Sequence, residues 1–230
     1  MDSKTVEDYL KTIYKLQSGG ERAKTSQVAH KLGVTAGTVT EMLKRLARRS
    51  PPLLTYKQHY GVRLTRHGRK RALDVIRRHR LLETFLQQTL GLAWDEVHQE
   101  AEILEHCLSK RVTDALDKFL QFPRSDPHGE PIPDADGRIA AQSGLSLSAL
   151  AAGQTFRVIR VQPVEAELLR YLKSEQIHIG TTGTLISRAP FDGPLTLRLR
   201  TGQSTRRCVL GRKAADQIFV EALATSLPAE

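Results

Sequence analysis

Residues 25–49 read TSQVAHKLGVTAGTVTEMLKRLARR, and this stretch decides the fold of the first third of the chain. Its pattern predicts a short helix that Thr25 caps, a break at Gly33, and a second helix that runs from Thr35 to about Arg49. Two short amphipathic helices joined by a tight turn containing glycine are typical of a helix-turn-helix. These residues alone leave a generic helical hairpin open as an alternative.

The following segment favours the helix-turn-helix over the hairpin of helices. Residues 53–56 and 61–64 are short apolar runs separated by a polar stretch, which predicts a two-stranded hairpin. A helix-turn-helix followed at once by such a hairpin is a winged helix. We expect Thr65 to cap a long helix toward Leu90, with a strongly basic first half suited to backbone phosphates.

Charge is distributed unevenly along the 230 residues. The net charge is +10, and residues 1–80 hold 19 Lys and Arg against 6 Asp and Glu, whereas the remainder holds 16 against 19. A basic N-terminal module indicates an anionic partner, nucleic acid first and a membrane surface second. No apolar run of about 18 residues is present to span a membrane, and the N-terminus is polar, so no secretory signal is expected.

The rest of the chain predicts more helices and then a small β domain. We expect one helix from Trp94 or Asp95 to about Leu108, another from Val112 to Phe119, and a loop or linker rich in proline, aspartate and glycine over 122–144. Short β-type runs then predict a small β-barrel. They lie at 155–161, 177–179, 183–187, 195–199 and 208–210.

Candidate metal ligands gather on the helix that contains His98. At i, i+4, i+7 and i+8, the residues His98, Glu102, Glu105 and His106 lie along one helical face. The pair His79 and Glu83 on the preceding helix, and Asp8 on the first helix, supply further donors. Imidazole and carboxylate ligands without a thiolate favour ions such as Mn²⁺ and Fe²⁺.

Several other interpretations of these residues stay open. Glu and His on a helix often form no more than a solvated face, which would make the chain a winged-helix regulator without a metal switch. Residues 102–106, EILEH, come near the HxxEH motif of inverted zincins but carry Glu where the first His is required, and no other catalytic motif is present. We therefore expect no enzyme, and metal storage or transport does not account for a winged helix.

The two cysteines are not expected to form a disulfide framework. Cys107 and Cys208 lie about a hundred positions apart without CxxC spacing, which fits a reducing cytoplasm. Cys107, adjacent to His106 but turned about 100° around the helix, is predicted to be buried.

Four stretches together resemble the iron- and manganese-dependent repressors, the diphtheria toxin repressor and manganese transport regulator group. They are residues 6–14 (VEDYLKTIY), 78–83 (RHRLLE), 102–109 (EILEHCLS) and 126–133 (DPHGEPIP), the last similar to the family's DP-x-G-x-PIP loop. The helix-turn-helix adds to this likeness. The resemblance covers roughly residues 5–135.

The resemblance implies a fold, partners and a ligand set. The fold is mainly α with a small β part: a winged helix-turn-helix (1–72), a helical metal-binding and dimerisation domain (73–143), a linker (144–154) and an SH3-like β-barrel (155–226). The implied main metal site is Asp8, Glu102, Glu105 and His106. The implied ancillary site is His79, Glu83 and His98, with Glu165 from the C-terminal domain, where Leu168 stands in place of a further glutamine ligand.

Two positions bear on which metal is bound. The iron branch of the family has Met and Cys where this chain has Asp8 and Glu102, so the harder carboxylates favour Mn²⁺, with Fe²⁺ as the alternative. Where the manganese branch has a second acidic ligand on the first helix, this chain has Lys11, which argues against the usual two-metal cluster.

The expected partners are double-stranded operator DNA and a second copy of the chain, with no membrane, in the cytoplasm. Metal is expected to tie Asp8 to the dimerisation helix and so fix the spacing of two winged helices over two half-sites. The predicted base-reading residues are Thr35, Gly37, Thr38 and Thr40. The predicted phosphate contacts are Lys44, Arg45, Arg48, Arg63, Arg66 and Arg69.

Overall fold

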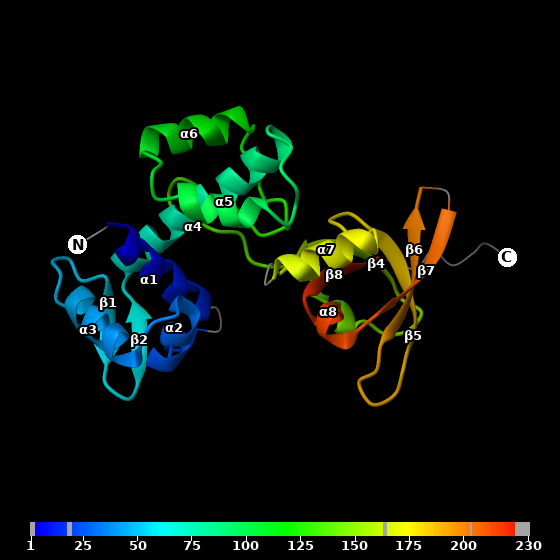
Figure 1. Ribbon diagram of the computed structural model, residues 1–230, viewed down its shortest axis with the longest axis horizontal. Coiled ribbons are helices and arrows are strands. Elements are labelled where there is room, and N and C mark those ends of the chain that lie inside the picture. The colour runs from blue at the N-terminus through cyan, green and yellow to red at the C-terminus, as the bar shows by residue number, and fades with distance from the viewer. Residues whose placement is uncertain (1–2, 18–19, 163–164, 203, 224–230) are drawn as a thin grey trace. The chain divides into compact units, whose positions relative to one another are not determined.

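The computed structural model describes residues 3–17, 20–162, 165–202 and 204–223 (Figure 1). Contacts between backbone positions divide the chain into two compact units. The first comprises Met1–Leu82, Ala101–Phe122 and Ile132–Ile139, and the second comprises Glu83–Glu100, Pro123–Pro131 and Ala140–Glu230. Residues 1–2 and 224–226 of the domains predicted above lie outside the described residues.

The first unit begins with three helices and a two-stranded hairpin, as the sequence predicts. The elements are α1 (Ser3–Leu16), α2 (Thr25–Leu32), α3 (Ala36–Ala47), β1 (Leu54–Lys57) and β2 (Gly61–Leu64). One face of each helix is apolar, and these faces enclose a core that includes Leu10, Ile13, Val28, Leu43 and Leu46. The arrangement is a winged helix-turn-helix, because β1 and β2 pair antiparallel directly after α3.

Helix ends in this region follow local hydrogen bonding. Thr35 accepts from the backbone N–H of Thr38 and so caps α3. The prediction that Thr25 caps α2 is wrong: Thr25 is the first helical residue, and the side chain of Gln27 accepts from the backbone N–H of Lys24 instead. Thr65 accepts from the N–H of Gly68 at the start of α4, as predicted.

One long helix and two short ones follow the hairpin. They are α4 (Arg66–Gln88), α5 (Val97–Leu104) and α6 (Lys110–Phe119). Gly68 permits close packing of α4, because a Cβ there would lie 1.8 Å from the carbonyl oxygen of Leu53. The predicted helix to Leu108 is too long: α5 ends at Leu104, so Glu105 and His106 lie in the turn that follows.

The second unit is built around one antiparallel sheet. Its strands are β3 (Leu145–Ser146), β4 (Thr155–Val161), β5 (Thr182–Arg188), β6 (Leu195–Thr201), β7 (Ser204–Leu210) and β8 (Ile218–Leu223), in the order β3-β8-β4-β5-β6-β7. The remaining elements are η1 (Leu147–Ala149), α7 (Ala166–Ser174) and α8 (Arg212–Asp216). Alternating residues of the strands face a core that contains Phe156, Leu197 and Val220.

Two expectations for this unit are wrong, and two of its elements were not expected. Within the described residues β3 and β7 lie at opposite edges of the sheet and do not pair, so the barrel is not closed. Residues 177–179 form a turn rather than a strand. The helix α7 and the strand β8 were not predicted, because single short runs of apolar residues do not distinguish these elements from loops.

Residues 123–131, within the same unit, lie along β4. The backbone N–H of Val161 donates to the carbonyl oxygen of His128 at 2.8 Å. Gly129, at φ +84°, approaches so closely that a Cβ would lie 2.1 Å from the carbonyl oxygen of Ile159. The guanidinium of Arg160 is 3.1 Å from Glu130, and both side chains are buried.

No helix among the described residues is both long and apolar enough to cross a membrane.

Candidate metal centre and DNA-binding surface

Three predicted ligands meet in the first unit. Asp8 comes from α1, while Glu105 and His106 come from the turn after α5, and their ligand atoms all lie within 4.8 Å of one another. Nε2 of His106 lies 3.0 Å from Oδ1 of Asp8 and 3.3 Å from Oε1 of Glu105. Two segments almost a hundred residues apart are thus brought together by two carboxylates and one imidazole.

The ring of His106 is oriented for metal ligation. Its Nδ1 donates to Oε2 of Glu7 at 2.8 Å, and Glu7 is also 3.0 Å from the guanidinium of Arg78. A partner on one imidazole nitrogen commonly fixes the tautomer and aims the other nitrogen at a metal. Nε2 is buried, and within the described part of the chain no group offers it hydrogen-bond geometry, although carboxylates surround it. This donor set fits a hard or borderline divalent cation.

Glu102 and His79 adjoin this group. Nδ1 of His79 donates to Oε2 of Glu105 at 2.6 Å and lies 4.0 Å from Oε1 of Glu102. Glu102, Glu105 and His79 therefore form a second convergent set that shares Glu105 with the first.

Lys11 inserts a cation between the two glutamates. Its ammonium lies 2.8 Å from Oε2 of Glu102 and 2.5 Å from Oε1 of Glu105, and the side chain is 5% exposed. Although burial works against charge, Glu105 and Glu102 raise the pKa of Lys11 above its usual value. The lysine thus stays an ammonium and partly offsets the repulsion between the two acids.

Burial and the neighbouring cations shift the pKa values of the acidic groups of the centre in opposite directions. Burial tends to raise the pKa of Glu102, but Lys11 and His79 outweigh it and hold that pKa at about 2. The same balance, with the His79 hydrogen bond included, lowers the pKa of Glu105. Burial raises the pKa of Asp8 despite the attraction of His106 and Lys11. Asp8 is therefore the acid of these three for which burial outweighs the attraction of the neighbouring cations.

A further group of donors lies within the second unit. His98 donates through Nδ1 to Oε1 of Glu83 at 2.9 Å. Glu83 also converges with Asp126 and His128, and these three side chains are buried. The sequence analysis did not select Asp126 or His128 as ligands, although both lie in the 126–133 segment that carries the family resemblance.

The buried loop residues have structural contacts as well. Asp126 accepts from the backbone N–H groups of His128 and Glu130 at 2.8 and 3.0 Å. His128 donates through Nε2 to the carbonyl oxygen of Trp94 at 3.1 Å and stacks on the Trp94 ring. Glu165 is exposed at the start of α7, and in the described ranges it belongs to no convergent set of donors.

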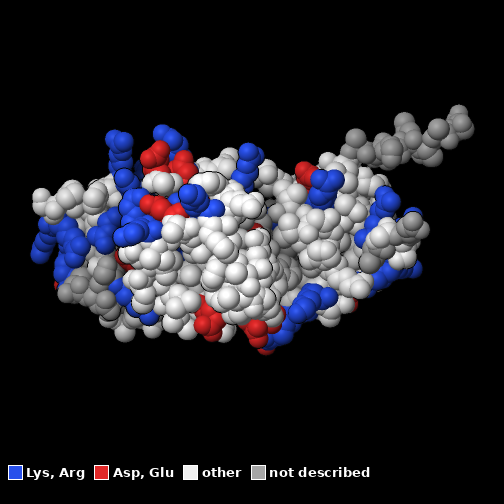
Figure 2. Space-filling view, turned by 90° about the horizontal axis from the view of Figure 1, so that it is seen from above, with Lys and Arg blue, Asp and Glu red and all other residues white. Residues whose placement is uncertain are grey.

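The residues predicted to contact DNA lie on the surface of the winged helix. The hydroxyls nearest the start of α3 are already engaged: Thr35 with Thr38 at 2.9 Å, and Thr40 as a donor to the carbonyl oxygen of Ala36. Gly37 is exposed between them. All six predicted phosphate contacts are exposed, namely Lys44, Arg45, Arg48, Arg63, Arg66 and Arg69. Figure 2 shows Lys and Arg gathered densely at its left end, where Figure 1 draws α1–α3.

Two surface features of the first unit were missed or misjudged. Cys107 is exposed, not buried, because α5 ends before it and the turn carries it outward. A set of large apolar side chains is also exposed on α5, α6 and the residues after α6. They are Ile103, Leu104, Val112, Phe119 and Phe122, with Phe119 63% and Phe122 67% exposed.

Family models match three successive parts of the chain. The model of the iron dependent repressor N-terminal DNA binding domain matches residues 1–62. The model of the iron dependent repressor metal binding and dimerisation domain matches residues 65–134, and the FeoA domain model matches residues 145–222.

Individual proteins show the same likeness. The iron-dependent repressor IdeR of Mycobacterium leprae is 39% identical over 129 residues, so the matched part spans 56% of this chain and 55% of that relative. The diphtheria toxin repressor of Corynebacterium efficiens is 32% identical over 193 residues, 80% of this chain and 83% of that one. A solved manganese-dependent transcriptional repressor in complex with manganese is 38% identical, with a TM-score of 0.86 over 95% of this chain and 100% of that chain.

Proposed function

The chain belongs to the iron-dependent repressor family, and from that premise we propose that it is a DNA-binding transcriptional repressor controlled by a divalent transition metal. The observation that carries the proposal is the convergence of Asp8, on the first helix of the winged-helix part, with Glu105 and His106. A ligand that joins these segments changes the restraint on the first helix directly.

The chain's own residues supply the switch. A bound divalent cation supplies the positive charge that offsets the repulsion among the carboxylates. Glu7 and Arg78 hold the His106 ring in its orientation. Asp8 offers a carboxylate oxygen from α1 as a metal ligand. With Asp8 engaged, α1 is held to the 101–108 segment. The ion acts on DNA affinity only as far as it favours this held state over the released one.

We assign Mn²⁺ as the metal, with Fe²⁺ as the alternative. Asp8, Glu102, Glu105 and His106 offer oxygen and nitrogen donors without sulfur, which suits Mn²⁺. One solved structure to which the chain is similar holds manganese. His79, Glu83, His98 and Glu165 are proposed as ligands of an outer site, and the geometry adds Asp126 and His128 as candidates beside Glu83.

The partners follow from surface chemistry. The exposed basic residues of the winged helix suit the phosphates of operator DNA, with Thr35, Gly37, Thr38 and Thr40 facing base edges. The exposed apolar set on α5 and α6 suits a two-fold homodimer, since such side chains are otherwise costly in water. The chain is proposed to act in the cytoplasm and not as an enzyme.

The proposed domain limits are those predicted from the sequence. They are 1–72 for the winged helix, 73–143 for the metal-binding and dimerisation domain, 144–154 for a linker, and 155–226 for an SH3-like domain of FeoA type. The antiparallel sheet of the second unit is the observation that supports the last assignment.

Operator binding measured with and without metal tests the proposal. A duplex is first selected from a random library in the presence of Mn²⁺, and its Kd is then measured in chelator, Mn²⁺ and Fe²⁺. Asp8→Asn should remove most of the metal response, whereas Asp136→Asn, an exposed control, should leave it intact. Equal affinity of the wild type in chelator and in metal would instead support a winged-helix regulator without a metal switch.

A further inference from the structure

The C-terminal domain contains more basic than acidic residues. Residues 81–144 contain 5 Lys and Arg against 12 Asp and Glu, whereas residues 145–223 contain 11 against 6. When these two segments are counted together, the acidic charge of the first offsets the basic charge of the second. Positive charge is therefore not confined to the winged helix.

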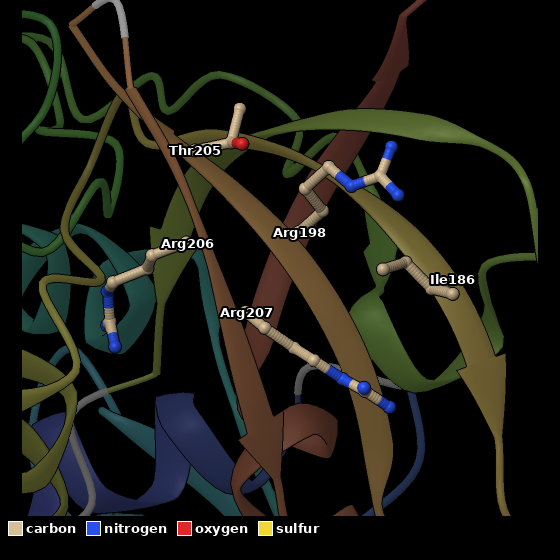
Figure 3. Close-up of a pocket in the computed structure, with 5 residues that line it drawn as sticks. All are labelled: Ile186, Arg198, Thr205, Arg206 and Arg207. Atoms are coloured by element: carbon tan, nitrogen blue, oxygen red, sulfur yellow. The ribbon is translucent and has the colours of Figure 1, made fainter.

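Much of this charge lies on the outer face of the sheet. Along β6 the leucines face the core and Arg198 and Arg200 face outward, both exposed. Arg207 on β7 is exposed and lies directly opposite Arg198 in the strand register. Figure 3 shows Arg198, Arg207 and Ile186 on one side of these strands and Arg206 on the other.

The three outward arginines lack an acidic counterpart in the described part of the chain. Within the described residues no carboxylate lies within 4.0 Å of the guanidinium of Arg198, Arg200 or Arg207. Arg206 differs, because it turns to the other side and pairs with Glu175 at 3.1 Å. Like charges placed directly opposite on neighbouring strands destabilise a sheet. The 198–207 pair thus opposes folding unless an anion lies beside it.

The surroundings of the pair are suited to an oxyanion. Thr184 lies opposite Arg198 on β5, and Thr205 lies opposite Arg200 on β7, so hydroxyl donors flank the guanidiniums. A shallow hollow lined by Ile186, Arg198, Thr205, Arg206 and Arg207 marks the place (Figure 3). Guanidinium groups present paired N–H donors that match the oxygens of a phosphate.

We propose that the outer face of β5–β7, centred on Arg198 and Arg207, is a binding site for a phosphate-bearing anion. The phosphate belongs to a nucleic-acid backbone or to a free polyphosphate, and both present the same tetrahedral oxyanion to the arginines. This site shares no residue with the proposed metal ligands.

Calorimetric titration of the full chain in chelator with sodium tripolyphosphate tests the site. R198Q/R207Q should weaken binding at least tenfold. R157Q is the matched control, since Arg157 is exposed on the same sheet but already paired with Glu221 at 3.1 Å. Unchanged binding in R198Q/R207Q, or an equal loss in R157Q, would overturn the proposal. Thermal unfolding should show the double variant no less stable than the wild type, which excludes misfolding as the cause of the loss.

A second arm identifies the source of the phosphate. Binding of a 20-base-pair duplex of mixed sequence is measured against salt concentration for the same proteins. Loss of two backbone contacts should lower the slope of log K against log salt by about 1.8. A lowered slope together with weakened tripolyphosphate binding assigns the face to nucleic acid. An unchanged slope with weakened tripolyphosphate binding assigns it to a free polyphosphate.

Discussion

The ammonium of Lys11 lies 2.5 Å from Oε1 of Glu105, although the two residues are 94 positions apart and both are buried. The same ammonium reaches Glu102 at 2.8 Å. The metal centre therefore contains a permanent cation of its own. This contact joins α1 to the segment after α5 through a lysine as well as through the predicted metal ligands.

Replacing Lys11 by methionine should destabilise the metal-free protein. K11M leaves Glu105 buried beside Glu102 without the ammonium, and breaking a buried pair in this way costs about 3–5 kcal/mol. Chemical unfolding in chelator measures the loss. Added Mn²⁺ should stabilise K11M more than the wild type, because the two carboxylates gain more from an added cation once the ammonium is gone. K31M, on the exposed end of α2, serves as the control. Equal unfolding free energies for K11M and K31M would show that the contact contributes nothing.

The centre in the first unit should bind one manganese ion per chain. Lys11 already places a positive charge between Glu102 and Glu105, which opposes a second cation at that position. K11E removes this charge and adds a carboxylate, so it should bind one ion more. Metal analysis after gel filtration gives the count, and electron paramagnetic resonance distinguishes an isolated ion from a coupled pair. Both measurements are made in an E83Q/H98A background, which removes two proposed ligands of the outer site. A coupled pair of manganese ions in the protein that retains Lys11 would contradict this expectation.

Periodicity in the sequence was sufficient for the local parts of the fold. The spacing of apolar residues predicted α2, α3 and the β1–β2 hairpin, since each is decided by neighbours within a few residues. The helical spacing gave Glu105 and His106 as candidate ligands, and the family resemblance assigned them to one site with Asp8; these three residues converge. Lys11 was named only as a departure, because a pattern along one helix cannot reveal a partner 94 positions away.

Other features depended on tertiary contacts that no local pattern records. The helix α5 ends at Leu104, although the residues up to Leu108 keep a helical pattern, so exposed Cys107 was predicted to be buried. Glu7 orients His106 from 99 residues away and gave no signal of its own beside Asp8. The open sheet was predicted as a barrel because strand runs give the number of strands but not whether the edges pair.

Acid should destabilise the metal-free protein in a defined pH window. The pKa of Glu102 is about 2 in the folded chain against an ordinary 4.5, and that of Glu105 is also lowered. A carboxyl group whose pKa is lowered by folding stabilises the fold at pH values above its pKa in the unfolded state. This contribution is lost as the pH falls from 4.5 toward 2. Melting temperatures recorded in chelator should fall more steeply across this window for the wild type than for K11M. Parallel curves would mean that Lys11 does not depress these carboxyl groups.

The two thiols should react at very different rates. Cys107 is exposed, whereas burial and the contact with Glu175 raise the pKa of Cys208 to about 12. Because the thiolate is the reactive form, a maleimide at pH 8 should label one cysteine in the native chain and two after denaturation. Peptide mapping identifies the labelled residue, and C107S should abolish native labelling. Prompt labelling of Cys208 in folded protein would contradict the burial described above.

Two arginine–glutamate ion pairs of the second unit should contribute very differently to the free energy of unfolding. Arg160 and Glu130 are both buried, and the guanidinium also lies 3.5 Å from the centre of the Phe219 ring, so the pair fastens the 123–131 segment to β4. R160M removes the guanidinium that lies beside the buried Glu130 carboxylate and should cost about 3–5 kcal/mol. R157M breaks an exposed pair with Glu221 and should cost about 0–1 kcal/mol. Denaturant unfolding compares the two. Glu83 converges with Asp126 and His128, which lie in the 123–131 segment. R160M should therefore also weaken metal binding at the outer site, whereas R157M should leave it unchanged.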